Sequence, residues 1–164
     1  MGAHLMHENA SNLDEESGSM PWTIVVADDA ADYREIVRTL LRPMSDTMTI
    51  VGEAEDGEQA LTLVRLERPD LVITDLIMPR LDGVALTRRI RQELPETRVI
   101  LISSHTEDAY RLWASDSGVD AFVSKQVITT SLVPAIRDLI RRRLSGGSDS
   151  LPPITGASSS SPAN

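Results

Sequence analysis

The chain has 164 residues, enough for one domain with tails, and its net charge of −9 at pH 7 argues against nucleic-acid binding by bulk charge. It has no cysteine, which excludes disulfides and thiolate zinc sites, and only 3% aromatic residues, so we expect an aliphatic core. No stretch approaches the ~18 consecutive apolar residues of a membrane span, and the polar, acidic N-terminus is unlike a signal peptide. We therefore expect a cytoplasmic protein without membrane association.

Polar segments flank a central region that carries the apolar patterns. Residues 1–20 contain a Glu/Asp cluster without apolar periodicity, so we expect a disordered N-terminal extension or a cloning remnant. Residues 145–164 are rich in Ser, Gly and Pro, a composition that cannot bury a core, so we expect a disordered tail. The folded unit is expected over residues 21–144.

Short apolar runs alternate with helical patterns through this unit. The strand candidates are rich in β-branched residues and bounded by turn residues; they span 23–27, 49–53, 71–74, 99–102 and 121–123. The helix candidates span 32–41, 58–67, 84–93, 107–117 and 130–144. Five β–α units with right-handed crossovers predict an α/β fold with a parallel sheet covered by helices on both faces. Periodicity alone leaves the strand order open; the commonest solution at this size is a five-stranded sheet of order 2-1-3-4-5, a flavodoxin-like (βα)5 three-layer sandwich.

Some helical residues carry expectations of their own. In 58–67, residues Ala60, Leu61, Val64 and Leu66 are assigned to the buried face. In 130–144, Pro134 is expected in the first turn, where its missing N–H costs little. The arginines of 137–143 form either an anion-binding patch or a helix end whose cations complement the helix dipole, and the second interpretation is favoured.

Polar residues follow four of the predicted strands. Asp28 and Asp29 follow the first, Asp75 the third, Ser103 the fourth and Lys125 the fifth. Singly, each has an ordinary explanation, such as a helix N-cap for an aspartate or a solvated surface charge for the lysine. In the order 2-1-3-4-5, however, these strand ends are neighbours. Carboxylates suit Mg²⁺, a carboxylate can form an aspartyl phosphate, and an ammonium can offset phosphoryl charge, so together they predict a divalent-metal site with a reactive aspartate.

Over residues 22–143 the chain resembles the receiver domain of two-component response regulators, the chemotaxis-regulator fold. The resemblance is carried by Asp28-Asp29, by the block from Pro69 to Gly83, by Ser103 and by Lys125. The second β–α unit also fits the pattern, with Gly52-Glu53-Ala54, Asp56-Gly57 and Ala60-Leu61.

The resemblance implies a phosphoacceptor and a metal site. Asp75 would accept a phosphoryl group from a sensor histidine kinase or a phosphotransfer protein. Mg²⁺ (or Mn²⁺) would be bound directly by Asp29, mainly through water by Asp28, and by Asp75 and the backbone carbonyl of Ile77. The chain would then be a signalling switch and not an enzyme, catalysing only its own phosphotransfer and slow dephosphorylation.

The resemblance also implies a switch. Ser103 would be the hydroxyl that moves toward the phosphoryl group, and Lys125 would pair with a phosphoryl oxygen. Phe122 would be the aromatic whose rotamer reports the state of the surface formed by strand 4, helix 4 and strand 5. The aspartyl phosphate would drive this change by adding charge and acceptor oxygens. A homodimer, through helix 4, strand 5 and helix 5 or through helices 1 and 5, is compatible with the resemblance.

Two departures from the commonest receiver pattern are informative. Gln126 stands where many members have proline, and Ser103-Ser104-His105 replaces Thr-Ala; both resemble receivers of LuxR-type helix-turn-helix regulators. No such effector follows in this sequence, so we expect no direct nucleic-acid binding by this chain. A removed C-terminal effector and a stand-alone receiver both stay open.

Two side chains beside the site bear on dephosphorylation. His105 either tunes that reaction or is an ordinary surface loop histidine, and the second interpretation is favoured. Ile77 offers no polar group to orient an attacking water, so we expect dephosphorylation slower than a half-life of seconds.

Three other classes of protein also place acidic residues or phosphate at a strand end of this kind of sheet. A phosphatase of the haloacid dehalogenase type needs an acidic residue two positions after its nucleophile, where this chain has Ile77. A flavodoxin-like cofactor binder would place phosphate beside Asp28 and Asp29, which would repel it without a metal. A pseudo-receiver, an interaction module that is never phosphorylated, remains the main alternative.

Overall fold

A five-stranded parallel sheet forms the centre of the computed structural model, which describes residues 20–105, 107, 111 and 116–146. The order β2-β1-β3-β4-β5 confirms the predicted one. The strands are β1 (Trp22–Ala27), β2 (Met48–Ala54), β3 (Leu71–Asp75), β4 (Arg98–Ser103) and β5 (Ala121–Ser124). Each extends the predicted run by one residue at one or both ends, because the bounds of a strand are set by backbone pairing and not by the side-chain pattern.

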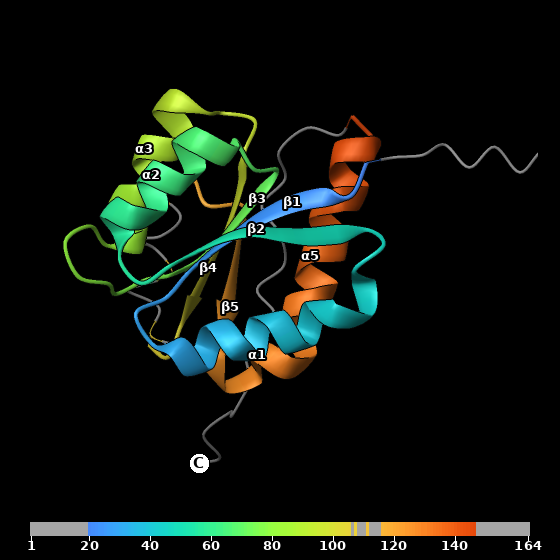
Figure 1. The fold of residues 1–164 in the computed structure, drawn as a ribbon, viewed down its shortest axis with the longest axis horizontal. Helices are drawn as coiled ribbons and strands as arrows, with labels where there is room; N and C mark the ends of the chain where they lie inside the picture. The colour runs from blue at the N-terminus through green and yellow to red at the C-terminus, as the bar shows by residue number, and fades with distance from the viewer. Residues whose placement is uncertain (1–19, 106, 108–110, 112–115, 147–164) are drawn as a thin grey trace, which may run out of the picture.

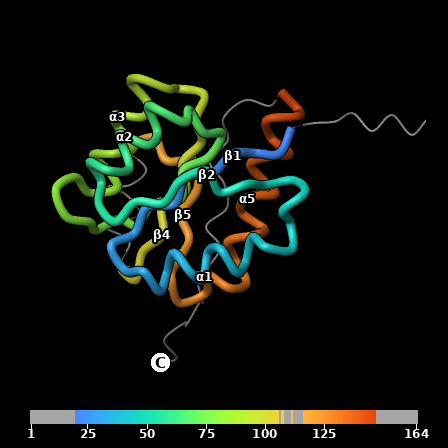
Figure 2. Tube along the Cα trace, viewed as in Figure 1, coloured from blue at the N-terminus to red at the C-terminus, as the bar shows by residue number. Residues whose placement is uncertain are grey.

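Helices cover both faces of the sheet. Figure 1 shows α1 (Ala31–Leu41) and α5 (Ile128–Leu144) on one face, with α2 (Gly57–Glu67) and α3 (Gly83–Glu93) on the other. The trace in Figure 2 shows the same two layers around the strands. Short 3₁₀ turns at Arg42–Met44 and Lys125–Val127 extend α1 and lead into α5. The helix expected over 107–117 lies largely outside the described residues.

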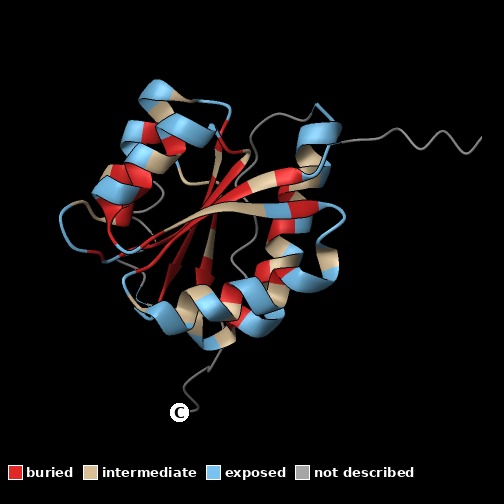
Figure 3. Ribbon diagram, in the orientation of Figure 1, coloured by how far each residue is buried: buried red, intermediate tan, exposed pale blue. Residues whose placement is uncertain are grey.

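The alternation of side chains along each strand supplies both cores. Ile24 and Val26 of β1 pack with α1 and α5, whereas Val25 and Ala27 pack with α2 and α3. The whole of β3 is buried, as expected for a central strand, and Figure 3 shows burial concentrated in the sheet and on the inner sides of the helices. Aliphatic residues dominate both layers, in line with the low aromatic content. None of the described helices combines the length and the hydrophobicity that crossing a membrane requires.

Two expectations about helical residues are wrong. Leu66 is 73% exposed, because it lies two residues beyond Val64, which places it about 200° further around the helix. Pro134 is not in the first turn, because α5 begins at Ile128 and the proline is therefore interior. The helix continues through Pro134 although the Thr130 carbonyl loses its usual helical donor. The buried side chains of α5, which include Leu132 and Ile136, offset that loss by packing against the sheet.

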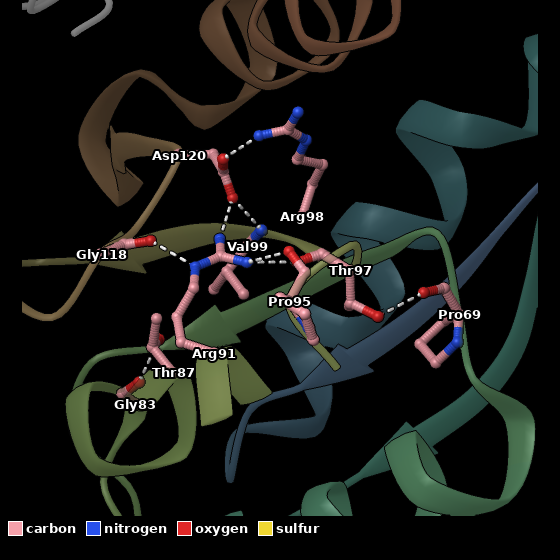
Figure 4. Close-up of polar contacts among 10 residues, drawn as sticks. All are labelled: Pro69, Gly83, Thr87, Arg91, Pro95, Thr97, Arg98, Val99, Gly118 and Asp120. Carbon is pink, nitrogen blue, oxygen red and sulfur yellow. Dashed lines mark hydrogen bonds and ion pairs between the residues drawn. The ribbon is translucent and has the colours of Figure 1, made fainter. Parts of the chain in front are cut away.

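A charged network joins segments at the amino ends of the strands, opposite the strand ends that carry the acidic residues (Figure 4). Asp120 accepts hydrogen bonds from Arg91, from Arg98 and from the backbone N–H of Val99. Arg91 also donates to the backbone oxygens of Gly118 and Thr97, at 2.8 and 2.6 Å. The network therefore holds the end of α3 against the starts of β4 and β5.

Candidate functional site

Four of the predicted site residues lie at the carboxyl ends of strands. Asp75 and Ser103 are the last residues of β3 and β4, while Asp28 and Lys125 directly follow β1 and β5. β3 pairs with both β1 and β4, and β4 pairs with β5, so the four strand ends are adjacent along one edge of the sheet. The parallel order of the strands thus assembles residues that are as far as 97 positions apart in the sequence.

Three carboxylates converge at this edge. Asp28, Asp29 and Asp75 each contribute one oxygen, and these atoms lie within 4.8 Å of one another. Asp28 is fully buried and Asp75 is 7% exposed, whereas Asp29 is exposed. Asp28 is held by its backbone N–H, which donates to Ala54, and by its Oδ1, which accepts from the N–H of Ala30 at 2.9 Å. The cluster therefore has two fixed members and one that faces solvent.

Lys125 is the cation of the site. Its Nζ lies 2.7 Å from Oδ2 of Asp28 and 3.4 Å from Oδ2 of Asp75, and its side chain is only 6% exposed. In the described structure its shorter ion pair is thus with Asp28 and not with the predicted phosphoacceptor. The Ser124 hydroxyl accepts from the N–H of Gln126, which begins the 3₁₀ turn that directs Lys125 to the site.

The environment of Asp75 disfavours its charged form. Burial is the largest cause, the neighbouring Asp28 carboxylate is the second, and together they raise the pKa of Asp75 to about 6. The Lys125 ammonium and a backbone hydrogen bond from Leu76 act in the opposite direction without cancelling the shift. An additional cation at the cluster would favour the ionised form, which is the form that acts as a nucleophile.

Close backbone contacts shape the loop between β3 and α3. A Cβ atom on Gly83 would lie 2.1 Å from the backbone oxygen of Asp75, and one on Gly57 would lie 1.8 Å from that of Leu81. Both positions therefore require glycine for lack of space. Asp82 caps α3 through Ala85, and the N–H of Gly83 donates to the oxygen of Leu76 at 2.8 Å.

The predicted switch residues occupy the neighbouring strands. Ser103 is buried, and its Oγ accepts from the N–H of His105 at 3.0 Å, so the hydroxyl oxygen is engaged with its own loop. Phe122 is partly buried and packs against Leu76, Val84 and Leu101 under the β3–α3 loop. The switching roles predicted for these residues stay predictions.

Ile77 is placed in the loop that follows Asp75. Its side chain is 48% exposed, which suits a residue whose predicted contribution is its backbone carbonyl. That contribution to a metal site, like the individual ligand roles of the three aspartates, stays a prediction.

Sequence reasoning missed two contacts of the site. Tyr33, in the first turn of α1, has its ring centroid 3.8 Å from Nζ of Lys125. Arg80 pairs with the buried Asp56, the N-cap of α2, at 2.7 Å and thereby ties the β3–α3 loop to that helix. The one available signal for Tyr33 was an aromatic residue four positions after Asp29 in a chain that has few aromatics.

The donor set fits a hard divalent cation. It consists of carboxylate oxygens without sulfur or imidazole, as Mg²⁺ prefers. Three carboxylates face one ammonium, so negative charge is in excess. Oδ2 of Asp28 is buried and, among the described residues, receives no hydrogen bond of normal geometry, although Lys125 is close to it. The acidic pocket could therefore hold a metal ion such as Mg²⁺ through Asp28, Asp29 and Asp75.

Comparisons with known proteins agree with this architecture. The family model for the response regulator receiver domain matches residues 24–137. The transcriptional regulatory protein NarL of Mycobacterium tuberculosis is 39% identical over 122 residues, which are 73% of this chain and 55% of that protein. The response regulator protein VraR of Staphylococcus saprophyticus is 33% identical over 118 residues, 72% of this chain and 56% of VraR. The chain thus spans about half the length of these curated relatives.

A solved structure shows the same arrangement of elements. The isolated receiver domain of RcsB from Salmonella enterica serovar Typhimurium, determined in the presence of the phosphomimetic BeF₃⁻, matches with a TM-score of 0.69 and 25% identity. The match covers 74% of this chain and 90% of that one. A parallel (βα) sandwich with an acidic cluster and a lysine at adjacent strand ends defines a signalling receiver. The chain belongs to the response regulator receiver domain family, as the receiver of a two-component response regulator.

Proposed function

We propose that this receiver accepts a phosphoryl group on Asp75 from a sensor histidine kinase or a phosphotransfer protein, in a Mg²⁺-dependent reaction. The observation that supports this most directly is the setting of Asp75: a nearly buried carboxylate with two further carboxylates and an ammonium at adjacent strand ends. The same setting serves Mn²⁺, which prefers similar oxygen ligands.

In this proposal each residue of the site has a defined task. An oxygen of Asp75 attacks the phosphorus atom, and the bond from phosphorus to the donor nitrogen breaks, leaving its electron pair on the imidazole, which takes up a proton. When bound, the metal would neutralise charge on the transferring group. Lys125 would exchange its contact with Asp28 for one with a phosphoryl oxygen, and Ser103 would release the N–H of His105 to donate to another.

The switch that follows would use the surface beside β4 and β5. Movement of Ser103 would leave space near Leu101, against which Phe122 already packs, and this would connect the phosphoryl group to Phe122 on β5. The chain would act in the cytoplasm, together with its phosphodonor, and would regulate a separate output without being an enzyme for another substrate.

Phosphorylation at Asp75 can be tested with a small donor. We expect intact-mass measurement to show one added phosphoryl group after incubation with acetyl phosphate and Mg²⁺, and none with Asp75→Asn. Asp46→Asn is a matched control, because it makes the same change at an exposed position that is not part of the acidic cluster. Label on Asp75→Asn would contradict the assignment, and an unmodified wild-type protein would favour a pseudo-receiver that acts only as an interaction module.

A further inference from the structure

Tyr33 covers the ammonium of the site with the face of its ring. It lies in the first turn of α1, is partly buried, and places its ring centroid 3.8 Å from Nζ of Lys125. An aromatic ring face attracts a cation at this distance, and the attraction is stronger where the cation is removed from water. Lys125 meets that condition, because its side chain is only 6% exposed.

The three contacts of the ammonium complement one another. A lysine ammonium has three N–H donors, and here Asp28 and Asp75 lie at 2.7 and 3.4 Å while the Tyr33 ring lies at 3.8 Å. The ring takes a side of the ammonium that water would otherwise occupy. It offers neither a charge nor a strong acceptor, so it attracts the cation without fixing the direction of an N–H.

This lack of direction matters for a lysine that has to change partners. A carboxylate in place of the ring would hold the ammonium in one orientation, and water would let the side chain leave the site. The ring instead leaves Nζ free to pivot between Asp28 and a group on Asp75 while it remains covered. Arg34, the next residue, donates to the backbone oxygen of Asp28 and so keeps this end of α1 against the site.

We propose that Tyr33 is a positioning residue for phosphotransfer, whose ring face keeps the Lys125 ammonium directed at the acidic cluster. This inference rests on the proposed function, because it assigns to Lys125 the task of meeting the phosphoryl group. It adds a residue of α1 to a site otherwise built from strand ends. It also makes the rate of phosphorylation depend on a ring that acts through its contact with Lys125.

The test compares Tyr33→Leu with Tyr33→Phe in phosphorylation by acetyl phosphate at saturating Mg²⁺. In this reaction an oxygen of Asp75 attacks phosphorus, the bond to the acetate oxygen breaks, and acetate leaves with the electron pair. Removing the ring should lower the rate constant about 2- to 30-fold, the range that a cation–π contact supplies. Tyr33→Phe retains the ring face and should stay within about twofold of wild type. Equal losses in both variants, or no loss in Tyr33→Leu, would overturn the proposal.

A double-mutant cycle separates this role from simple packing. In a Lys125→Met background the ammonium is absent, so Tyr33→Leu should have little further effect on the rate, whereas a packing defect would persist there. A second readout needs no turnover: the NMR signals of the Lys125 ε-methylene protons should be shifted by the ring in wild type and Tyr33→Phe, and not in Tyr33→Leu. Unshifted signals in wild type would refute the contact. Failure of wild type itself to be phosphorylated would instead count against the proposed function.

Discussion

The carboxyl group of Asp75 holds its proton more tightly than the carboxyl group of an ordinary aspartate does. Its pKa is raised from 3.8 to about 6, first by burial and then by the charge of Asp28. Because the folded state holds the proton more tightly than the unfolded state, this group favours folding fully only below about pH 3.8. The contribution is lost as the pH rises through about 6, so at neutral pH the ionised Asp75 destabilises the metal-free fold.

Asp75→Asn should therefore stabilise the protein in a pH-dependent way. In EDTA at pH 8, we expect its free energy of unfolding to exceed that of wild type by up to about 3 kcal/mol, the equivalent of roughly two pKa units. The advantage should shrink as the pH is lowered toward 4, where wild-type Asp75 is protonated. Urea unfolding at a series of pH values measures this difference. A gain that does not depend on pH, or one of equal size in Asp46→Asn, would show that the charge of Asp75 is not the cause.

At the scale of elements, the loop between β3 and α3 is determined by contacts with its neighbours. Gly83 sits directly against the backbone oxygen of Asp75, Gly57 of α2 sits against Leu81, and Arg80 pairs with Asp56. Arg80 has a positive φ of 69°, an unusual conformation for a residue with a side chain. The loop that follows the reactive aspartate is thus held from both α2 and α3.

Gly83→Ala should displace this loop. The new methyl group would lie 2.1 Å from the backbone oxygen of Asp75, which cannot move without disturbing the end of β3. We expect a loss of about 1–3 kcal/mol in the free energy of unfolding, as for other overpacked positions, together with weaker Mg²⁺ binding. Gly52→Ala is the control, because its methyl group would meet only the flexible side chain of Leu63, at 3.2 Å. Equal effects of the two substitutions in urea unfolding and Mg²⁺ titration would contradict this explanation.

At the scale of the whole molecule, two helical layers support a sheet edge that concentrates negative charge. Core packing on both faces holds the strands in register, and the network around Asp120 anchors their opposite ends. Asp28, Asp29 and Asp75 are kept close together by this packing although their charges repel. A bound cation would relieve that repulsion, so metal binding and global stability should be coupled.

Mg²⁺ should accordingly stabilise the folded chain. At a concentration 100 times its dissociation constant, a ligand that binds only the folded state adds about 2.7 kcal/mol to the free energy of unfolding. We expect this gain in wild type and in Asp46→Ala, and its loss in Asp29→Ala, because Asp29 is the exposed member of the cluster and the predicted direct ligand. Thermal unfolding during a Mg²⁺ titration provides the measurement. An undiminished gain in Asp29→Ala would remove that residue from the metal site.

Much of the fold was predictable because its signals are local. Apolar runs such as 71–74 end at turn residues, and helical periods such as that of 32–41 repeat within one segment, so the elements and their α/β class follow from neighbouring residues. The strand order needed the additional regularity that βαβ units of this size usually adopt one arrangement. The placement of Leu66 failed because two residues along a helix reverse the face.

For the site, the sequence by itself determined which side chains stand at strand ends, because the end of an apolar run marks the end of a buried strand. Asp28, Asp75, Ser103 and Lys125 were all located in this way. Only the tertiary structure decided that Lys125 pairs more closely with Asp28 than with Asp75, and that Tyr33 covers its ammonium. These contacts join segments far apart in the chain, and their distances depend on how helices and strands pack, which no local pattern of residues encodes.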